Sequence, residues 1–361
     1  KINDIAEKCL MCDKCHALCP VGVDAPALRR AQRATVNNSL PYDYSYLKTD
    51  SPLPEPSLSA PEPAEVTAHA LPLKPTHLAP EPTLPVASAS SASAHTSVTE
   101  PVEVTTHASV ANPSLPVTEP AEVISNIQES SSGEKVMYFA GCMTHLTPRI
   151  IKSVEKVFKS AGVNYIFADR DGGICCGRPL MLAGKTDAAY ETISANRKMI
   201  LSSGCRTLVL SCPICYKIFK DEYALEGVEV LHYTQFIKRL TDEGDLKPVA
   251  GDERIVYHDP CELGRGCGVY KEPREVLAQV GTLVKAAKEG DESICCGGSL
   301  GSLTLDARDR AKITESSVAN LLVNNSQTIV TACPLCLKTF SESTPDTVKV
   351  QDFAELISHH L

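Results

Sequence analysis

The chain has 361 residues and a formal net charge of −9, and 43% of its residues are hydrophobic. These values are typical of a soluble protein with two domains of ordinary size and some further segments. No apolar run approaches the roughly 18 residues of a membrane-spanning helix, and no basic block is present, so we expect neither a transmembrane segment nor a nucleic-acid partner.

Sixteen cysteines are a heavy load for a chain of this length. In a secreted protein they would suggest disulfides, whereas in a cytoplasmic protein they indicate metal or redox chemistry. No secretory signal is in view, so the spacing of the cysteines has to decide between the two, and it leads us to expect a cytoplasmic protein. The sequence starts at Lys1 rather than at a methionine, so we expect that the true N terminus lies further upstream.

Residues 1–40 are expected to form a partial ferredoxin-like segment, with a helix over the stretch DAPALRRAQRATV. The stretch CLMCDKCHALCP has the spacing of the bacterial ferredoxin run, whose fourth cysteine binds the cluster next to the one held by the first three. Its cysteines are Cys9, Cys12, Cys15 and Cys19. Since one run is present, we expect that its other half precedes this sequence or has been lost. A four-cysteine zinc knuckle is the alternative.

Residues 41–133 have a different composition. They hold fifteen of the chain's 25 prolines, and no glycine occurs between Gly22 and Gly133. The dipeptide Glu-Pro recurs at intervals of 19 residues, from residues 62, 81, 100 and 119. Because large apolar residues are missing, the repeat cannot bury a core, and we predict a disordered, extended linker. A Pro-rich docking motif is the alternative.

From residue 134 onward, short β-branched runs alternate with helix-spaced stretches, which predicts an α/β fold with mostly parallel sheets. The pattern occurs twice. KVMYFAGC at 135 matches RIVYHDPC at 254, ICCG at 174 matches ICCG at 294, and RTLVLSCPICYKIF at 206 matches QTIVTACPLCLKTF at 327. The offset stays between 119 and 121 residues. We therefore interpret residues 134–245 and 246–361 as two duplicated domains.

Each domain carries a set of five cysteines, placed just after expected strands or at glycine-rich turns, and one further cysteine outside that set. The first set is Cys142, Cys175, Cys176, Cys212 and Cys215, and the second set is Cys261, Cys295, Cys296, Cys333 and Cys336. Open α/β sheets place their sites at such strand ends, so each set is expected to converge there. A closed zinc site takes four ligands, a disulfide framework needs an even number, and inert buried cysteines would not repeat in register. Thiolates around an iron–sulfur centre account for both the number and the repetition.

This arrangement resembles the cysteine-rich CCG domain of heterodisulfide reductase B and D subunits. The iron–sulfur subunits of glycolate and lactate oxidases and of anaerobic glycerol-3-phosphate dehydrogenase share that domain. The stretch VYHDPCELGRGCGVYKEPREVL at 256–277 is similar to the second-domain signature of the D-type proteins. The resemblance implies a noncubane [4Fe-4S] cluster on each five-cysteine set, and a cubane [4Fe-4S] cluster on the N-terminal run if that run is complete. The linker is unlike the family.

Five residues outside these sets have weaker signals. Cys205 is interpreted as a small packing residue, and Cys267 as a neighbour of the second set to which no ligand role is assigned. His258 is either a proton donor beside the second set or a structural histidine. Arg265 and Arg274 would contact an anionic substrate or a partner, or face solvent.

The chain has no GxGxxG fingerprint in a strand–helix setting, so we expect it to bind no flavin or nicotinamide of its own. The resemblance implies an iron–sulfur oxidoreductase subunit with heterodisulfide-reductase-like chemistry, which receives electrons from a flavoprotein or membrane cytochrome subunit. A location at the inner face of the membrane would come through that partner. Two alternatives stay open. One is an electron-transfer subunit of an FAD-linked glycolate, D-lactate or glycerol-3-phosphate dehydrogenase feeding quinone, and the other is a non-redox zinc-binding module.

The linker sets a condition on electron transfer from the N-terminal run. A flexible chain of this length spans about 50 Å on average, which exceeds a useful tunnelling distance. The N-terminal segment is therefore expected to dock back onto the two domains.

Overall fold

The computed structural model describes residues 6–20, 24–35, 135–298 and 305–361, all of which fall within one compact unit. The predicted linker at 41–133 lies outside the described residues. Within them, no helix is long and apolar enough to cross a membrane.

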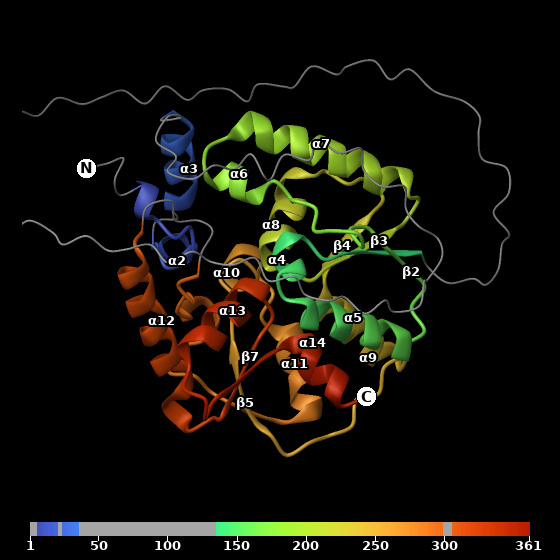
Figure 1. Cartoon of the computed structure of the whole chain (residues 1–361), viewed down its shortest axis with the longest axis vertical. Coiled ribbons are helices and arrows are strands. Elements are labelled where there is room, and N and C mark those ends of the chain that lie inside the picture. Colours follow the sequence, from blue (N-terminus) through green and yellow to red (C-terminus); the bar gives the residue numbers. More distant parts are fainter. Residues whose placement is uncertain (1–5, 21–23, 36–134, 299–304) are drawn as a thin grey trace, which may run out of the picture. The chain divides into compact units, whose positions relative to one another are not determined.

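Two four-stranded parallel sheets form the framework (Figure 1). The first has the strand order β2-β1-β3-β4, from Tyr165–Phe167, Val136–Phe139, Thr207–Leu210 and Glu229–His232. The second has the corresponding order β6-β5-β7-β8, from Thr282–Val284, Arg254–His258, Thr328–Thr331 and Lys349–Asp352. Every residue of β1, β3 and β7 is buried, as expected for apolar strands that are covered on both faces. The predicted α/β fold with parallel sheets and two repeats is confirmed.

Helices connect the strands and close each domain. In the first domain they are α4 (Cys142–His145), α5 (Pro148–Ser160), α6 (Arg178–Leu182), α7 (Thr186–Ser202), α8 (Pro213–Glu222) and α9 (Tyr233–Glu243). In the second they are α10 (Gly264–Cys267), α11 (Lys271–Val280), α12 (Ala307–Leu321), α13 (Pro334–Ser343) and α14 (Phe353–His359), with 3₁₀ turns η2 (Gly290–Glu292) and η3 (Leu322–Asn324). The N-terminal segment contains α2 (Lys14–Ala17) and α3 (Ala25–Thr35). The predicted boundary between residues 245 and 246 falls between α9 and β5.

The two domains pack through equivalent surfaces. Helix α5 packs on α14, and α11, which corresponds to α5, packs on α9, which corresponds to α14 (Figure 1). Tyr233 and Phe353 hold equivalent positions, and their rings meet edge to face with centroids 5.7 Å apart. The Tyr233 hydroxyl also donates to Asp352 Oδ2 at 2.7 Å. Reciprocal contact between equivalent elements is the property of a two-fold interface, so the duplication has produced an internal pseudo-dimer.

Candidate iron–sulfur sites

The first set lies at the carboxyl ends of β1 and β3. Cys142 opens α4 directly after β1, the adjacent pair precedes α6, and the CxxC motif caps and begins α8. The Cys175 thiol hydrogen-bonds to Cys142. Cys215 hydrogen-bonds to both Cys176 and Cys212. The chain thus brings its five predicted thiols into two hydrogen-bonded groups at one sheet edge.

The second set is joined more completely. The Cys295 sulfur hydrogen-bonds to Cys261 and Cys296. Cys336 donates to Cys296 with the sulfurs 3.2 Å apart, and it also contacts Cys333. All five cysteines line one pocket with an empty volume of about 410 Å³, a figure that includes the solvent at its mouth. The rest of the lining is formed by Leu10, Leu182, Pro213, Ile214, Pro260, Glu262 and Leu335.

Glycines allow the backbone to approach these sulfurs. A Cβ at Gly141, whose φ is +79°, would lie 2.7 Å from Cys215 Sγ, and a Cβ at Gly173 would lie 2.6 Å from Cys142 Cα. The Gly177 N–H donates to Cys175 Sγ at 3.3 Å. Larger residues would therefore intrude on the first set. Soft thiol donors, close backbone and N–H groups directed at sulfur fit an iron–sulfur cluster.

A single zinc ion is a poorer fit. Tetrahedral zinc requires four ligands at about 2.0–2.3 Å from one point. Among the described residues, no group of three or more His, Cys, Asp or Glu side chains is arranged to hold one metal ion. An iron–sulfur cluster instead distributes its cysteines over several irons.

In each set one thiol has a pKa below its usual value. The hydrogen bond from Cys175 lowers the pKa of Cys142 to about 7. Hydrogen bonds from Cys261 and Cys296 hold the pKa of Cys295 well below its usual value. The donors Cys261 and Cys296 have pKa values raised well above the usual value, by donation to Cys295 and by burial. Because metals bind thiolates, loading a set with metal releases the protons of those ligands that still carry one.

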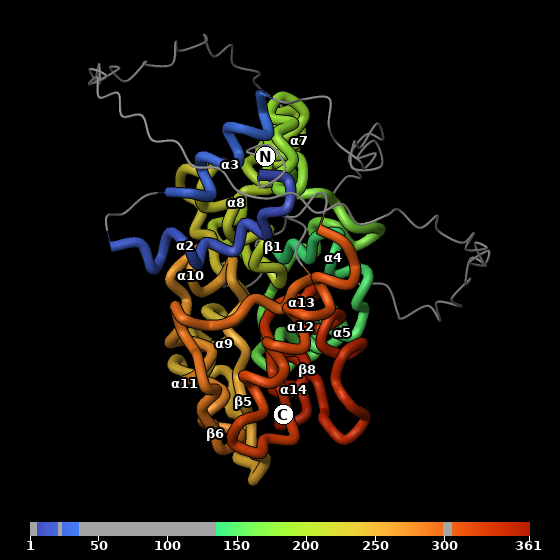
Figure 2. The backbone as a smooth tube through the Cα atoms, turned by 90° about the vertical axis from the view of Figure 1, so that its left-hand side faces the viewer, coloured from blue at the N-terminus to red at the C-terminus, as the bar shows by residue number. Residues whose placement is uncertain are grey.

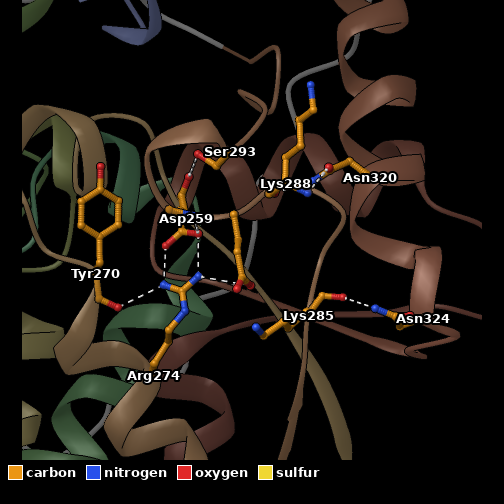
Figure 3. Close-up of polar contacts among 10 residues, drawn as sticks. Asp259, Tyr270, Arg274, Lys285, Lys288, Ser293, Asn320 and Asn324 are labelled. Carbon is orange, nitrogen blue, oxygen red and sulfur yellow. Dashed lines mark hydrogen bonds and ion pairs between the residues drawn. The ribbon is translucent and has the colours of Figure 1, made fainter. Parts of the chain in front are cut away.

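Asp259 organises the backbone around the second set (Figure 3). Its carboxylate accepts from both terminal nitrogens of Arg274, at 2.6 and 2.7 Å, and from the Gly290 N–H at 2.8 Å. The Ser293 hydroxyl donates to the Asp259 carbonyl at 3.5 Å. These bonds join the β5 end that carries Cys261 to the loop that leads to Cys295. Arg274 therefore pairs with Asp259 of the same chain. From the sequence, we expected Arg274 to contact a substrate or a partner protein, or to face solvent.

Asp169 has the matching role in the first domain, and the sequence did not single it out. It lies buried after β2 and accepts from the N–H groups of Ala140 and Gly141, at 2.9 and 2.8 Å. His145 Nε2 lies 3.3 Å from the same carboxylate. An acidic residue just after a strand, in FADRDGG, was the available signal. An aspartate after a strand is equally typical of a turn, so this signal was insufficient to predict that Asp169 holds the backbone beside the first set.

Three secondary expectations can now be compared with the structure. His258 is buried, its Nδ1 lies 3.2 Å from the Thr331 hydroxyl, its Nε2 lies 3.2 Å from the Ile294 carbonyl, and burial lowers its pKa. This arrangement favours the structural interpretation of His258. Cys205 is buried in the core of the first domain, as a packing residue should be. Cys267 is absent from the pocket lining, and burial raises its pKa to about 12.

The N-terminal run lies against the second domain. Cys12 packs, with Leu10, on the apolar cluster that contains Cys295, Cys296, Cys333 and Cys336. Burial, followed by the nearby Cys295, raises the pKa of Cys12. Cys9 and Cys19 are half-buried and Cys15 is exposed. The predicted docking thus brings one cysteine of the run to the second set.

Comparison with known proteins agrees with this picture. Residues 136–220 and 255–341 each match the family model of the cysteine-rich domain CCG. An EtfAB:quinone oxidoreductase of Syntrophomonas wolfei is 29% identical over 65% of this chain and 35% of its own length. The B subunit of the fumarate reductase (CoM/CoB) of Methanothermobacter marburgensis is 29% identical over 62% and 46%. The D subunit of the dihydromethanophenazine:CoB–CoM heterodisulfide reductase of Methanosarcina barkeri is 28% identical over 63% and 59%. The matched region thus spans between about a third and three fifths of these relatives.

Proposed function

Because the chain carries two domains of the cysteine-rich CCG family, we propose that it is an iron–sulfur subunit of an oxidoreductase and that its reaction is the reduction of a disulfide to two thiols. Relatives at this level of similarity include subunits of reductases, among them the D subunit of a heterodisulfide reductase. The matching region in those relatives is the part that this chain shares. This similarity supports iron–sulfur electron transfer, and the cleavage of a disulfide is the part that we propose.

The ten cysteines of the two sets are the proposed ligands. The first set would hold one noncubane [4Fe-4S] cluster and the second set another, while Cys9, Cys12, Cys15 and Cys19 would hold a cubane cluster if the run is complete. The convergence of each set and the tight glycines around the first support this assignment. When bound, such clusters would supply single electrons.

The observation that carries the proposal is the position of the pocket. Besides the whole second set, it is lined by Pro213 and Ile214, which lie between Cys212 and Cys215 of the first set. The pocket therefore adjoins both sets. With the second cluster held inside it by these five cysteines, a disulfide at the mouth of the pocket would take up two electrons and two protons, its S–S bond would break, and two thiols would leave. Leu10, Leu182 and Leu335 provide apolar contacts for the carbon chains of such a substrate.

The electrons would come from a partner. We propose a flavoprotein or a membrane cytochrome subunit as that partner, and no flavin or nicotinamide bound by this chain. Membrane attachment would then depend on the partner, with this chain on the cytoplasmic side.

A second candidate function is supported by the similarity to an EtfAB:quinone oxidoreductase. In that case the same cysteines would carry electrons from a flavoprotein toward quinone, and the pocket would hold no substrate. The two candidates share all their ligands, so ligand substitutions alone do not separate them.

A direct assay separates the two functions. The anaerobically purified chain is supplied with reduced viologen and a panel of small symmetrical and mixed disulfides. Disulfide reduction predicts viologen oxidation with release of two thiols for every two electrons. Cys176→Ser and Cys296→Ser should each abolish it, and Cys205→Ser, which changes a cysteine outside both sets, should not. Viologen that stays reduced with every disulfide, but is oxidised by a quinone analogue, would favour the second candidate.

A further inference from the structure

The N-terminal segment is attached to both domains at the edge of the pocket. In the first domain, Arg33 Nη1 donates to the Leu182 carbonyl at 2.7 Å, and a Cβ at Gly184 would lie 2.5 Å from the backbone of α3. The same guanidinium binds the carbonyls of Ala6, Glu7 and Cys9. Arg33 thus folds the start of the segment onto α6, whose Leu182 lines the pocket.

Arg265 makes the corresponding attachment in the second domain. Its Nε donates to the Cys12 carbonyl at 2.7 Å. Its Nη1 donates to the Ser293 carbonyl and hydroxyl, at 2.8 and 2.7 Å. One rigid guanidinium therefore holds the ferredoxin-like run and the loop that precedes Cys295 in a fixed relation. Figure 2 shows α2 of this run beside α10, which carries Arg265.

Lys14 adds a second bond across the same junction. Its ammonium donates to the Glu292 carbonyl at 2.8 Å. Lys14 and Arg265 thus approach the same turn from the two sides of the junction. The backbone carbonyls of the 291–293 turn offset their repulsion.

The first domain lacks this attachment, despite the duplication. At the 119-residue offset that relates Cys142 to Cys261, the residue equivalent to Arg265 is Leu146, whose side chain is 69% exposed. At the 120-residue offset of the two ICCG motifs, Ser293 corresponds to Gly173, which has no side chain. The two domains have therefore diverged at the positions that hold the N-terminal run in the second domain.

We propose that Arg265 is a positioning residue that docks the N-terminal ferredoxin-like run on the second set, so that electrons enter the two domains at the second set and reach the first set from there. This inference rests on the proposed function for the presence of clusters. The docking itself does not depend on which substrate is reduced. Among the cysteines of the run, Cys12 packs on the apolar residues around Cys295 and Cys296, together with Leu10.

The test uses the full chain, purified without oxygen, with Arg265→Met and a matched control, Arg254→Met. Arg254 is exposed, and its guanidinium donates to the Asn324 carbonyl at 3.3 Å, away from the N-terminal run. Hydrogen exchange of the backbone amides in residues 6–20 reports docking without any assay of activity. Loss of charge-assisted bonds of this kind should raise that exchange by about tenfold or more in Arg265→Met. Exchange in β7 and α13, iron content and the control should not change.

A kinetic measurement then tests the route. Under rapid mixing with reduced ferredoxin or viologen, the second set should become reduced before the first in the unmodified chain, and Arg265→Met should slow both by about tenfold. Lys14→Met removes the bond from the N-terminal run to the Glu292 carbonyl, and it should also slow the reduction of both sets, by a smaller factor. Unchanged exchange in residues 6–20 would overturn the docking role, and reduction of the first set before the second would overturn the route.

These outcomes are distinct from failure of the proposed function. A chain without iron would refute the function and leave the exchange result to decide the docking. A chain with iron but without disulfide reduction would refute the substrate and leave both measurements valid.

Discussion

Arg178 donates from Nη2 to both carboxylate oxygens of Glu262, at 3.2 and 3.0 Å, and this pair connects the two domains. Arg178 comes two residues after Cys176, and Glu262 comes directly after Cys261. Both side chains are buried, with 3% and 9% exposed. Burial raises the pKa of the Glu262 carboxyl even with the guanidinium beside it. We therefore interpret this ion pair as fixing the position of one cysteine set relative to the other, rather than as a large net contribution to the stability of the chain.

Breaking this pair should be costly. Arg178→Met leaves a buried, unpaired carboxylate, and we expect it to lower the free energy of unfolding by about 3–5 kcal/mol. The double variant Arg178→Met, Glu262→Leu removes both charges and should recover most of that loss. Denaturant unfolding of the two variants and the unmodified chain provides the measurement. A loss in Arg178→Met below about 1 kcal/mol, as for an exposed pair, would contradict the interpretation.

Gly141 gives a prediction that is specific to the first set. Gly141→Ala places a Cβ 2.7 Å from Cys215 Sγ. It should reduce the iron content by about four per chain, one cluster, because the ligand cannot keep its position. Gly162→Ala is the matched control. Its φ of +67° imposes similar backbone strain, but nothing lies within 4 Å of the added Cβ. Equal iron contents in the two variants would show that Gly141 has no role at the site.

Cys296, which belongs to the second set, and Cys267, which lies outside it, provide a matched pair of variants. Cys296→Ser should remove about four irons, whereas Cys267→Ser should remove none, because Cys267 does not line the pocket. Iron and acid-labile sulfide are measured on both variants after anaerobic purification. Loss of iron in Cys267→Ser would add this residue to the ligand set and change the assignment.

Asp352 predicts a pH dependence of stability that arises at the domain interface. Burial raises the pKa of its carboxyl to about 7. The hydrogen bond from Tyr233 lowers that pKa but is outweighed by burial. Since the folded state holds this proton more tightly than the unfolded state, the stabilising contribution is complete below about pH 4. It is lost as the pH rises toward about 7. Asp352→Asn keeps a neutral acceptor for Tyr233 and removes the titration.

The measurement compares the variant with the unmodified chain at two pH values. The free energy of unfolding of Asp352→Asn, relative to the unmodified chain, should rise between pH 4 and pH 8 by up to about 4 kcal/mol. The exposed Asp252→Asn should show no such rise. A constant difference across this range would mean that Asp352 is ionised throughout.

The sequence was sufficient for those parts of the molecule in which repetition and spacing carry the information. The two parallel sheets follow from apolar strands that repeat at a constant offset, and the convergence of each five-cysteine set follows from its position at strand ends. The partners of Arg265, Arg274 and Arg178 could not be predicted in this way. Each binds a group that is distant in the chain or in another loop, and such pairs depend on how the loops meet after the sheets have formed.

Asp169 and Asp259 illustrate the same limit. Both aspartates hold the backbone beside a cysteine set, yet they occupy different positions in the two repeats, after β2 and after β5. An internal comparison of the repeats therefore does not align them. Their common role became visible through their hydrogen bonds.

The most direct test of the central claim is the iron and acid-labile sulfide content of the anaerobically purified chain, with an electron paramagnetic resonance spectrum of the same sample. Two filled five-cysteine sets predict about eight irons with matching sulfide, and about twelve if the N-terminal run is filled as well. Stoichiometric zinc without sulfide would contradict the account and leave the zinc-binding module as the function of these domains.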